Sequence, residues 1–243
     1  AWLALGADGR ITVYSGKVDL GTGVKTALTQ MVADELEVEF DSIHMVMGDT
    51  ASTVDQGQTA GSLSISVGGQ QLRRACATAR RAMAAQAAAR WGVPVDDIVF
   101  TGDGRVQVKS DPQKVQSYAA LMADGVRHIE VDAKAPLKPV ANYRYVGQSV
   151  RRVDIPAKLT GEFQYIHDVD LPNMLHTRVL RPASIGAHLI DFDDAAAKKT
   201  KGYVGAVRKG NFLAIVAQTE WAAVKAQRLV KTQWSDWKGL PEK

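Results

Sequence analysis

Residues 11–47 read ITVYSGKVDLGTGVKTALTQMVADELEVEFDSIHMVM, and this stretch decides the fold of the N-terminal part of the chain. Alternating apolar side chains predict two strands, over Arg10–Ser15 and over Ile43–Met47. Between them, apolar residues recur every three or four positions from Val24 onward, which predicts a helix. Thr22 is expected to cap this helix. The stretch is therefore predicted to fold as a strand–helix–strand unit.

The predicted helix carries Asp34, Glu35 and Glu37 off its apolar face. Charged side chains are almost never fully buried unless they are paired. We therefore expect these three carboxylates on the exposed side of the helix.

A glycine-bearing turn, Gly21-Thr22-Gly23, joins the first strand to the helix. Glycine lets the backbone approach a ligand closely, and a helix N-terminus offers N–H groups to an anion. A Gly-x-Gly turn is, however, more often only a tight turn. Asp19-Leu20-Gly21-Thr22 also resembles the first phosphate loop of actin-like ATPases, but the second glycine-rich loop of that fold is missing from the sequence.

Small and polar residues dominate from Gly48 to Gly68, before a long helix predicted over about Gln70–Trp91. Such a loop inside a packed domain is usually functional or mobile. Gly61 allows close backbone approach, and the hydroxyls of Ser62 and Ser64 would share one face of an extended segment. A solvated loop with helix-capping side chains is the plainer alternative.

The long helix places Cys76 on its apolar stripe, where we expect a small buried side chain. Its arginines lie off that stripe, and they predict a solvated face or a subunit interface. No histidine pair has metal-ligand spacing on a helix. The arginines are Arg73, Arg74, Arg80, Arg81 and Arg90.

The rest of the chain shows weaker patterns. Asp103-Gly104 predicts a hairpin turn, and a short helix is expected from about Ser117 to Gly125. Proline-bearing residues 126–148 predict a linker. Beyond the linker, alternation and helical spacing predict a smaller α/β module. Its strands are expected at Leu175–Leu180, Tyr203–Val207 and Phe212–Ala217, and its helices at Asp193–Lys199 and Glu220–Leu229.

Composition limits the class of protein. The net charge of +4 is too small to indicate nucleic-acid binding. No apolar run approaches the roughly 20 residues of a membrane-spanning helix. A single cysteine excludes an internal disulfide and a cysteine-ligated iron–sulfur cluster within the chain.

Several long stretches resemble the molybdopterin-binding large subunit of the xanthine oxidase family. The similarity is to the branch of isoquinoline 1-oxidoreductase and nicotinate dehydrogenase, and it extends over essentially the whole chain. The stretches that carry it are GKVDLGTGV at 16–24, GDT at 48–50, DQG at 55–57 with the residues up to 64, VGQ at 146–148, RVDIPAKLTG at 152–161 and DVDLPNMLH at 168–176.

The resemblance implies an α+β fold. Residues 1–140 would be part of a molybdenum-cofactor-binding domain of mixed sheets and helices, and residues 141–243 a smaller hammerhead-like α/β domain. Many relatives have Gln at the position of Thr22, so its shorter side chain puts a direct contact in question. The implied cofactor-binding residues are Gly21, Thr22, Gly23, Gly61, Ser62, Ser64 and Gln70.

The implied activity is that of a molybdenum hydroxylase, which oxidises an N-heterocycle or an aldehyde with oxygen taken from water. The family's catalytic glutamate lies in a Gly-x-Gly-Glu motif that this sequence lacks. We therefore predict cofactor-binding loops, but neither a catalytic residue nor a metal ligand, in this chain. Alternatives are a non-catalytic assembly subunit of such a complex and an actin-like ATP-binding module.

The resemblance also implies partners and a location. The remaining molybdopterin-binding domains would come from the same precursor or from a separate chain. Iron–sulfur clusters would lie on a partner subunit, with a cytochrome c as a possible electron acceptor and a small molecule as substrate. No nucleic acid is expected. The bacterial periplasm, or association with the inner membrane, is the favoured location.

Overall fold

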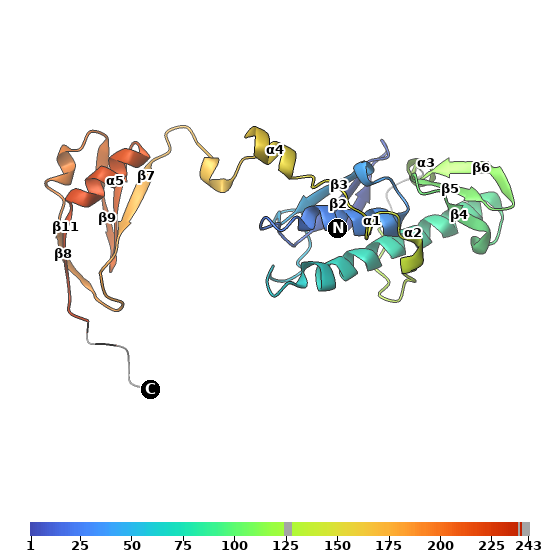
Figure 1. Cartoon of the computed structure of the whole chain (residues 1–243), viewed down its shortest axis with the longest axis horizontal. Helices are drawn as coiled ribbons and strands as arrows, with labels where there is room; N and C mark the ends of the chain where they lie inside the picture. Colours follow the sequence, from blue (N-terminus) through green and yellow to red (C-terminus); the bar gives the residue numbers. More distant parts are fainter. Residues whose placement is uncertain (124–127, 238, 240–243) are drawn as a thin grey trace. The chain divides into compact units, whose positions relative to one another are not determined.

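The computed structural model of the protein describes residues 1–123, 128–237 and 239. The chain forms two compact units, Ala1–Phe163 and Gln164–Lys243 (Figure 1). Both units combine helices with small sheets, so the predicted α+β class is confirmed.

The first sheet of the N-terminal unit has the strand order β1-β2-β3. β1 (Leu3–Leu5) is antiparallel to β2 (Ile11–Ser15). β2 is parallel to β3 (Ile43–Met47). Parallel neighbours need a crossover, and helix α1 (Val24–Leu36) provides it. The predicted strand–helix–strand unit is therefore confirmed.

Helix α2 (Gln70–Trp91) packs along α1 (Figure 1) and completes the main core of this unit. A π-helical turn, η2 (Ser64–Gly69), leads directly into it. Cys76 is fully buried in the core, as predicted, and burial raises the pKa of its thiol. The residues of this core with no exposed surface are Val13, Leu28, Val32, Leu72, Cys76, Ala87, Val106 and Leu121.

A second sheet, with the order β4-β5-β6, lies beyond α2 in the chain. The predicted hairpin is β4 (Ile98–Phe100) with β5 (Arg105–Val108). A third strand, β6 (Asp111–Ser117), was not predicted, because it begins Asp-Pro and shows no buried alternation. Helix α3 (Tyr118–Met122) follows it. Residues 124–127, at the end of the predicted short helix, lie outside the described residues.

Glu35 and Asp34 are 1% and 2% exposed, so their predicted place on the exposed side of α1 is wrong. Glu35 forms ion pairs with Arg73 at 3.0 Å and with Arg80 at 3.1 Å. It also accepts a hydrogen bond of 2.9 Å from the backbone N–H of Lys138. Two cations and a backbone donor together compensate a carboxylate that burial alone would destabilise.

The arginines of α2 are also placed differently from the prediction of a solvated face. Arg73 and Arg80 donate to the carbonyls of Lys138 and Pro136 as well as pairing with Glu35. Arg74 donates to the carbonyl of Ala135 at 2.7 Å. Three arginines therefore bind the backbone of 135–138 within the same unit.

Residues 128–148 are not a free linker. Beyond the contacts of 135–138, the backbone N–H groups of Arg144, Tyr145 and Val146 all donate to the carboxylate of Asp34, at 2.7 to 3.3 Å. Among these residues the only helical turn is the 3₁₀ turn at Val140–Asn142. The segment is held by the two buried carboxylates of α1, which no local sequence pattern reveals.

The chain stays with the first unit through helix α4 (Ile155–Thr160), so the compact unit ends at Phe163 rather than at the predicted boundary of 140. The N–H of Val153 donates to Thr26 Oγ1 at 3.0 Å, near the start of α1. Asp154 accepts hydrogen bonds of 2.7 Å from both Arg152 and Lys158. The Val153–Thr26 bond holds the segment 152–158 against the first turn of α1, and the contacts of Asp154 order the segment itself.

The second unit has a three-stranded antiparallel sheet of order β7-β10-β9. Helix α5 packs against it, as predicted over Glu220–Leu229. A two-stranded ribbon joins β8 (Leu189–Asp193) to β11 (Lys231–Trp234). The sheet strands are β7 (His176–Leu180), β9 (Tyr203–Lys209) and β10 (Phe212–Ala217).

The predicted helix over Asp193–Lys199 is wrong. Asp193 ends strand β8, and only a 3₁₀ turn forms at Ala197–Lys199. Within the range of the predicted helix, Asp194 forms an ion pair with Lys198 at 2.8 Å and accepts a hydrogen bond from Tyr203. Within the described residues, no helix is long and apolar enough to cross a membrane.

Replacing the buried carboxylate, Glu35→Gln, should lower the free energy of unfolding by about 3 kcal/mol or more, because two arginines lose their buried partner. Urea unfolding followed by circular dichroism measures this change. Asp111→Asn is the matched control, since Asp111 is exposed and pairs with Lys114 at 3.7 Å. Equal effects of the two variants would contradict the central role of Glu35.

Asp154 should stabilise the fold in a pH-dependent way. Hydrogen bonds from Arg152 and Lys158 hold the pKa of Asp154 well below its usual range. Its stabilisation is therefore complete above the unfolded-state pKa of about 4 and is lost as the pH falls below that value. The unfolding free energies of the wild type and of Asp154→Asn should converge on acidification. A difference that is independent of pH would show that charge is not involved.

Candidate functional site

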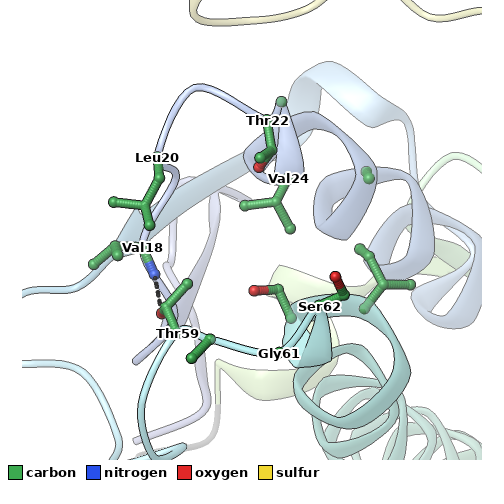
Figure 2. A pocket seen from close by; sticks show the side chains of 12 residues that line it. Val18, Leu20, Thr22, Val24, Thr59, Gly61 and Ser62 are labelled. Carbon is green, nitrogen blue, oxygen red and sulfur yellow. Dashed lines mark hydrogen bonds between the residues drawn. The ribbon is translucent and has the colours of Figure 1, made fainter.

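One open pocket of about 390 Å³ lies between the two predicted loops. Figure 2 shows Thr22 and Val24, at the start of α1, across the hollow from Gly61 and Ser62. The loops are far apart in the sequence, so the fold alone brings them together. The lining residues are Val18, Leu20, Thr22, Gly23, Val24, Ala27, Thr59, Ala60, Gly61, Ser62, Ser64 and Ile65.

The second loop is not extended, contrary to the prediction. Gly61 and Ser62 have φ values of 61° and 59°, in the left-handed region. For a serine this conformation costs roughly 1–2 kcal/mol, so the surrounding structure must stabilise it. Ser64 then begins the π-helical turn η2. Both serines still line the pocket, but through this tight turn rather than through strand alternation.

The π-helical turn explains how the second loop comes so close to α1. A side chain at Gly69 would bring its Cβ to 2.7 Å from the Cε of Met31 on α1. A Cβ at residue 69 would therefore require the flexible end of Met31 to move, and glycine leaves this packing undisturbed. π-helical turns are rare and are found frequently at functional sites. The turn η2, which begins at Ser64, thus packs against α1.

The first loop is capped by Asp19, whereas Thr22 was predicted to be the cap. One Asp19 oxygen accepts from the N–H groups of Gly21 at 2.9 Å and Gly23 at 3.2 Å, and the other accepts from Lys25 at 3.1 Å. Gly23 is the N-cap residue and has no side-chain cap bond of its own. The N–H groups that were expected to attract an anion are therefore largely occupied by a carboxylate.

The charge of Asp19 is stabilised where it lies. Partial burial raises the pKa of Asp19, but hydrogen bonds from the backbone of Lys25, Gly21 and Gly23 outweigh burial and leave it below the usual value. A fixed negative charge at this helix end disfavours a second anion there. The first loop is thus better suited to an uncharged ligand group than to a phosphate.

Five of the seven predicted site residues line the pocket. Gly21, with φ 95°, shapes the turn but is not among the lining residues. Gln70 is exposed at the start of α2 and also lies outside the lining. The five that line the pocket are Thr22, Gly23, Gly61, Ser62 and Ser64.

The sequence interpretation did not single out the apolar lining, which comes from Val18, Leu20, Val24, Ala27 and Ile65. Their position in the sequence could have indicated these residues. Each of them lies in or next to a predicted loop, or in the first turn of the helix that follows it. Leu20 is 73% exposed although it is large and apolar. Exposed apolar side chains grouped at one opening indicate a surface that receives a ligand or another part of a protein.

The described residues contain no group of three or more His, Cys, Asp or Glu side chains placed to hold a metal ion. The polar groups of the pocket are hydroxyls and backbone groups instead. Thr59 Oγ1 accepts a hydrogen bond from the N–H of Val18 at 3.1 Å (Figure 2). The site therefore combines uncharged donors and acceptors with apolar side chains on both of its sides.

Several proteins similar to this chain are named as dehydrogenases or oxidoreductases. It is 38% identical to a subunit of nicotinate dehydrogenase from Pseudomonas putida, over 99% of the chain and 21% of that protein. It is 30% identical to the membrane-bound aldehyde dehydrogenase [pyrroloquinoline-quinone] of Gluconacetobacter polyoxogenes, over 96% of the chain and 31% of that protein. It is 27% identical to the beta subunit of isoquinoline 1-oxidoreductase from Brevundimonas diminuta, over 100% of the chain and 35% of that protein.

The chain thus spans between 21% and 35% of the length of these relatives. Residues 1–165 match a family described as the molybdopterin cofactor-binding domain. This range contains both loops and the whole pocket, and it ends close to the boundary of the first compact unit at Phe163. The chain belongs to the molybdopterin cofactor-binding domain family.

Proposed function

We propose that this chain forms one wall of the cofactor site of a molybdenum hydroxylase, and that the cofactor lies against the pocket between Thr22–Val24 and Gly61–Ser64. The observation that carries the proposal is the meeting of these two loops at one pocket. The match of residues 1–165 to the cofactor-binding family supports it.

The lining fits the chemistry of a pterin. A pterin is a flat heteroaromatic ring system with N–H and carbonyl groups along its edge. Val24, Ala27 and Ile65 offer apolar surface to the flat faces, and Ser62 and Ser64 offer hydroxyls to the edge. In this proposal the metal is held by the cofactor, and the side chains of the pocket bind the organic part.

The proposed reaction is hydroxylation of an electron-poor carbon, with oxygen from water and two electrons passed on. The bound cofactor would supply the redox chemistry, while residues of this chain would bind and orient it. An N-heterocyclic substrate is favoured, because two relatives are named for nicotinate and isoquinoline. The relative named as an aldehyde dehydrogenase keeps an aldehyde as the second candidate.

The catalytic glutamate would come from outside this sequence, which lacks the Gly-x-Gly-Glu motif. The proposed complex therefore includes the remaining molybdopterin-binding domains and an iron–sulfur subunit, with a cytochrome c as acceptor. Two relatives are named as subunits, and this supports an assembly of several chains. A periplasmic or inner-membrane-associated location agrees with the relative named membrane-bound.

Ser62→Ala with Ser64→Ala should lower cofactor content by tenfold or more, because two hydroxyls each worth about 1 kcal/mol are removed from the pocket. Molybdenum is measured by mass spectrometry, and pterin by fluorescence after oxidation. Ser66→Ala is the matched control, since Ser66 is exposed in the same helical turn and does not line the pocket.

Unchanged cofactor content in the double variant would remove these serines from the site. An intact, assembled wild-type complex without molybdenum or pterin would contradict the proposal itself and favour a non-catalytic assembly subunit.

The ATP-binding alternative predicts that MgATP binds at the first loop. The carboxylate of Asp19 already accepts the N–H groups that a phosphate would need there. We therefore expect no heat of MgATP binding in isothermal titration calorimetry. Saturable binding that Asp19→Asn alters would support the ATP-binding alternative instead.

A further inference from the structure

Lys17 is a buried lysine whose position is not explained by any ion pair among the described residues. It is 2% exposed and lies at the beginning of the segment that leads from β2 to the first loop. Its Nζ donates to the backbone carbonyls of Gly57 at 3.2 Å and Gln58 at 2.8 Å. Lysine is almost never fully buried, so the loop that it contacts must compensate the loss of hydration.

Gln56 complements Lys17 from the other side. Its Oε1 accepts hydrogen bonds from Ser15 Oγ at 2.7 Å and from the N–H of Gly16 at 2.9 Å. Its Nε2 donates to the carbonyl of Gly68 at 3.1 Å and to Gln71 Oε1 at 2.9 Å. This buried amide thus uses its full capacity of two donated and two accepted hydrogen bonds.

These contacts form a continuous series between two segments. Ser15 and Gly16 bind Gln56, Lys17 binds the carbonyls at 57 and 58, and Val18 binds Thr59. The first segment continues into the loop at 21–23, and the second continues into the loop at 59–64. The series therefore fixes the separation of the two sides of the pocket. Its last pair, Val18 and Thr59, lines the pocket, whereas Lys17 and Gln56 do not.

The packing around Lys17 is close as well. A Cβ at Gly68 would lie 3.0 Å from Lys17 Cγ and 3.3 Å from Cε. The aliphatic part of Lys17 therefore packs against the π-helical turn that carries Ser64, while its Nζ holds residues 57–58. The side chain of Lys17 thus contacts the chain at residues 57–58, just before the residues that line the pocket, and at Gly68, just after them.

We infer that Lys17 and Gln56 are positioning residues that hold the second loop, Thr59–Ser64, against the first loop and so preform the pocket for its ligand. The consequence for ligand affinity rests on the proposed function. The consequence for the loop itself does not, because the contacts exist within the chain.

The test compares Lys17→Met, Lys17→Arg and Gln56→Glu in the full-length protein. Methionine keeps the length of the side chain but removes its donors. Loss of the two hydrogen bonds from Lys17 Nζ should loosen the second segment. The N–H groups of Gly16 and Val18 donate to Gln56 and Thr59 of that segment, so we expect hydrogen exchange in residues 15–20 to accelerate roughly tenfold in Lys17→Met. Exchange in α2 should remain unchanged. Lys114→Met, at an exposed ion pair, is the matched control.

Cofactor content is the second measurement. We expect it to fall about tenfold in Lys17→Met and in Gln56→Glu. Arginine retains donors for the two carbonyls, so we expect Lys17→Arg to recover part of the loss. Folded variants with unchanged exchange in 15–20, or a Lys17→Arg no better than Lys17→Met, would overturn the inference.

Two further outcomes are decisive. If exchange rises equally throughout α2 in both Lys17→Met and Gln56→Glu, the residues hold the whole domain and the inference is wrong. If wild-type protein carries no cofactor, the proposed function fails, and the local exchange result alone then supports or overturns the positioning role.

Discussion

The buried carboxylate of Glu35 is the interaction on which the N-terminal unit depends. It pairs with arginines at two positions of α2, Arg73 and Arg80, and it accepts the N–H of Lys138. A buried charge that has lost its hydration is unfavourable unless other groups pair with it, so each of these partners is required. The single group therefore fixes α1, α2 and a segment about a hundred residues further along the chain. Because α1 and α2 each follow one loop of the pocket, Glu35 also determines how those loops face each other.

Much of this fold was predictable because its signals are local. The periodicity of α1, α2 and α5, and the alternation in β2, β3 and β10, depend on neighbouring residues alone. The burial of Asp34 and Glu35 was not predictable, because all their partners are distant in the sequence. The arginines that pair with Glu35 belong to the next helix, and the backbone partners at 138–146 lie more than a hundred residues away. The same contacts explain why residues 128–148 looked like a linker: their order comes from distant carboxylates, not from a period of their own.

The residues that meet at the pocket were predicted in part for the same reason, while their role in binding a cofactor stays a prediction. Glycine and serine spacing indicated the loops that contain Thr22 and Ser62, and both residues line the pocket. The predicted extended conformation of the second loop was wrong, because a left-handed serine followed by a π turn has no sequence signature. The role of Thr22 as a cap was also wrong, because Asp19 reaches the same helix end through three backbone hydrogen bonds.

The charged groups of this unit share one property that bears on the pocket. Asp19 and Asp34 are satisfied largely by backbone N–H groups, Glu35 by arginines and a backbone N–H, and Lys17 by backbone carbonyls. None of them lines the pocket, whose polar side chains are all hydroxyls. Charge is thus used to hold the scaffold, and the ligand meets neutral groups. Hydroxyls both donate and accept, so they suit the edge of a heteroaromatic ring whose donors and acceptors alternate better than a fixed cation would.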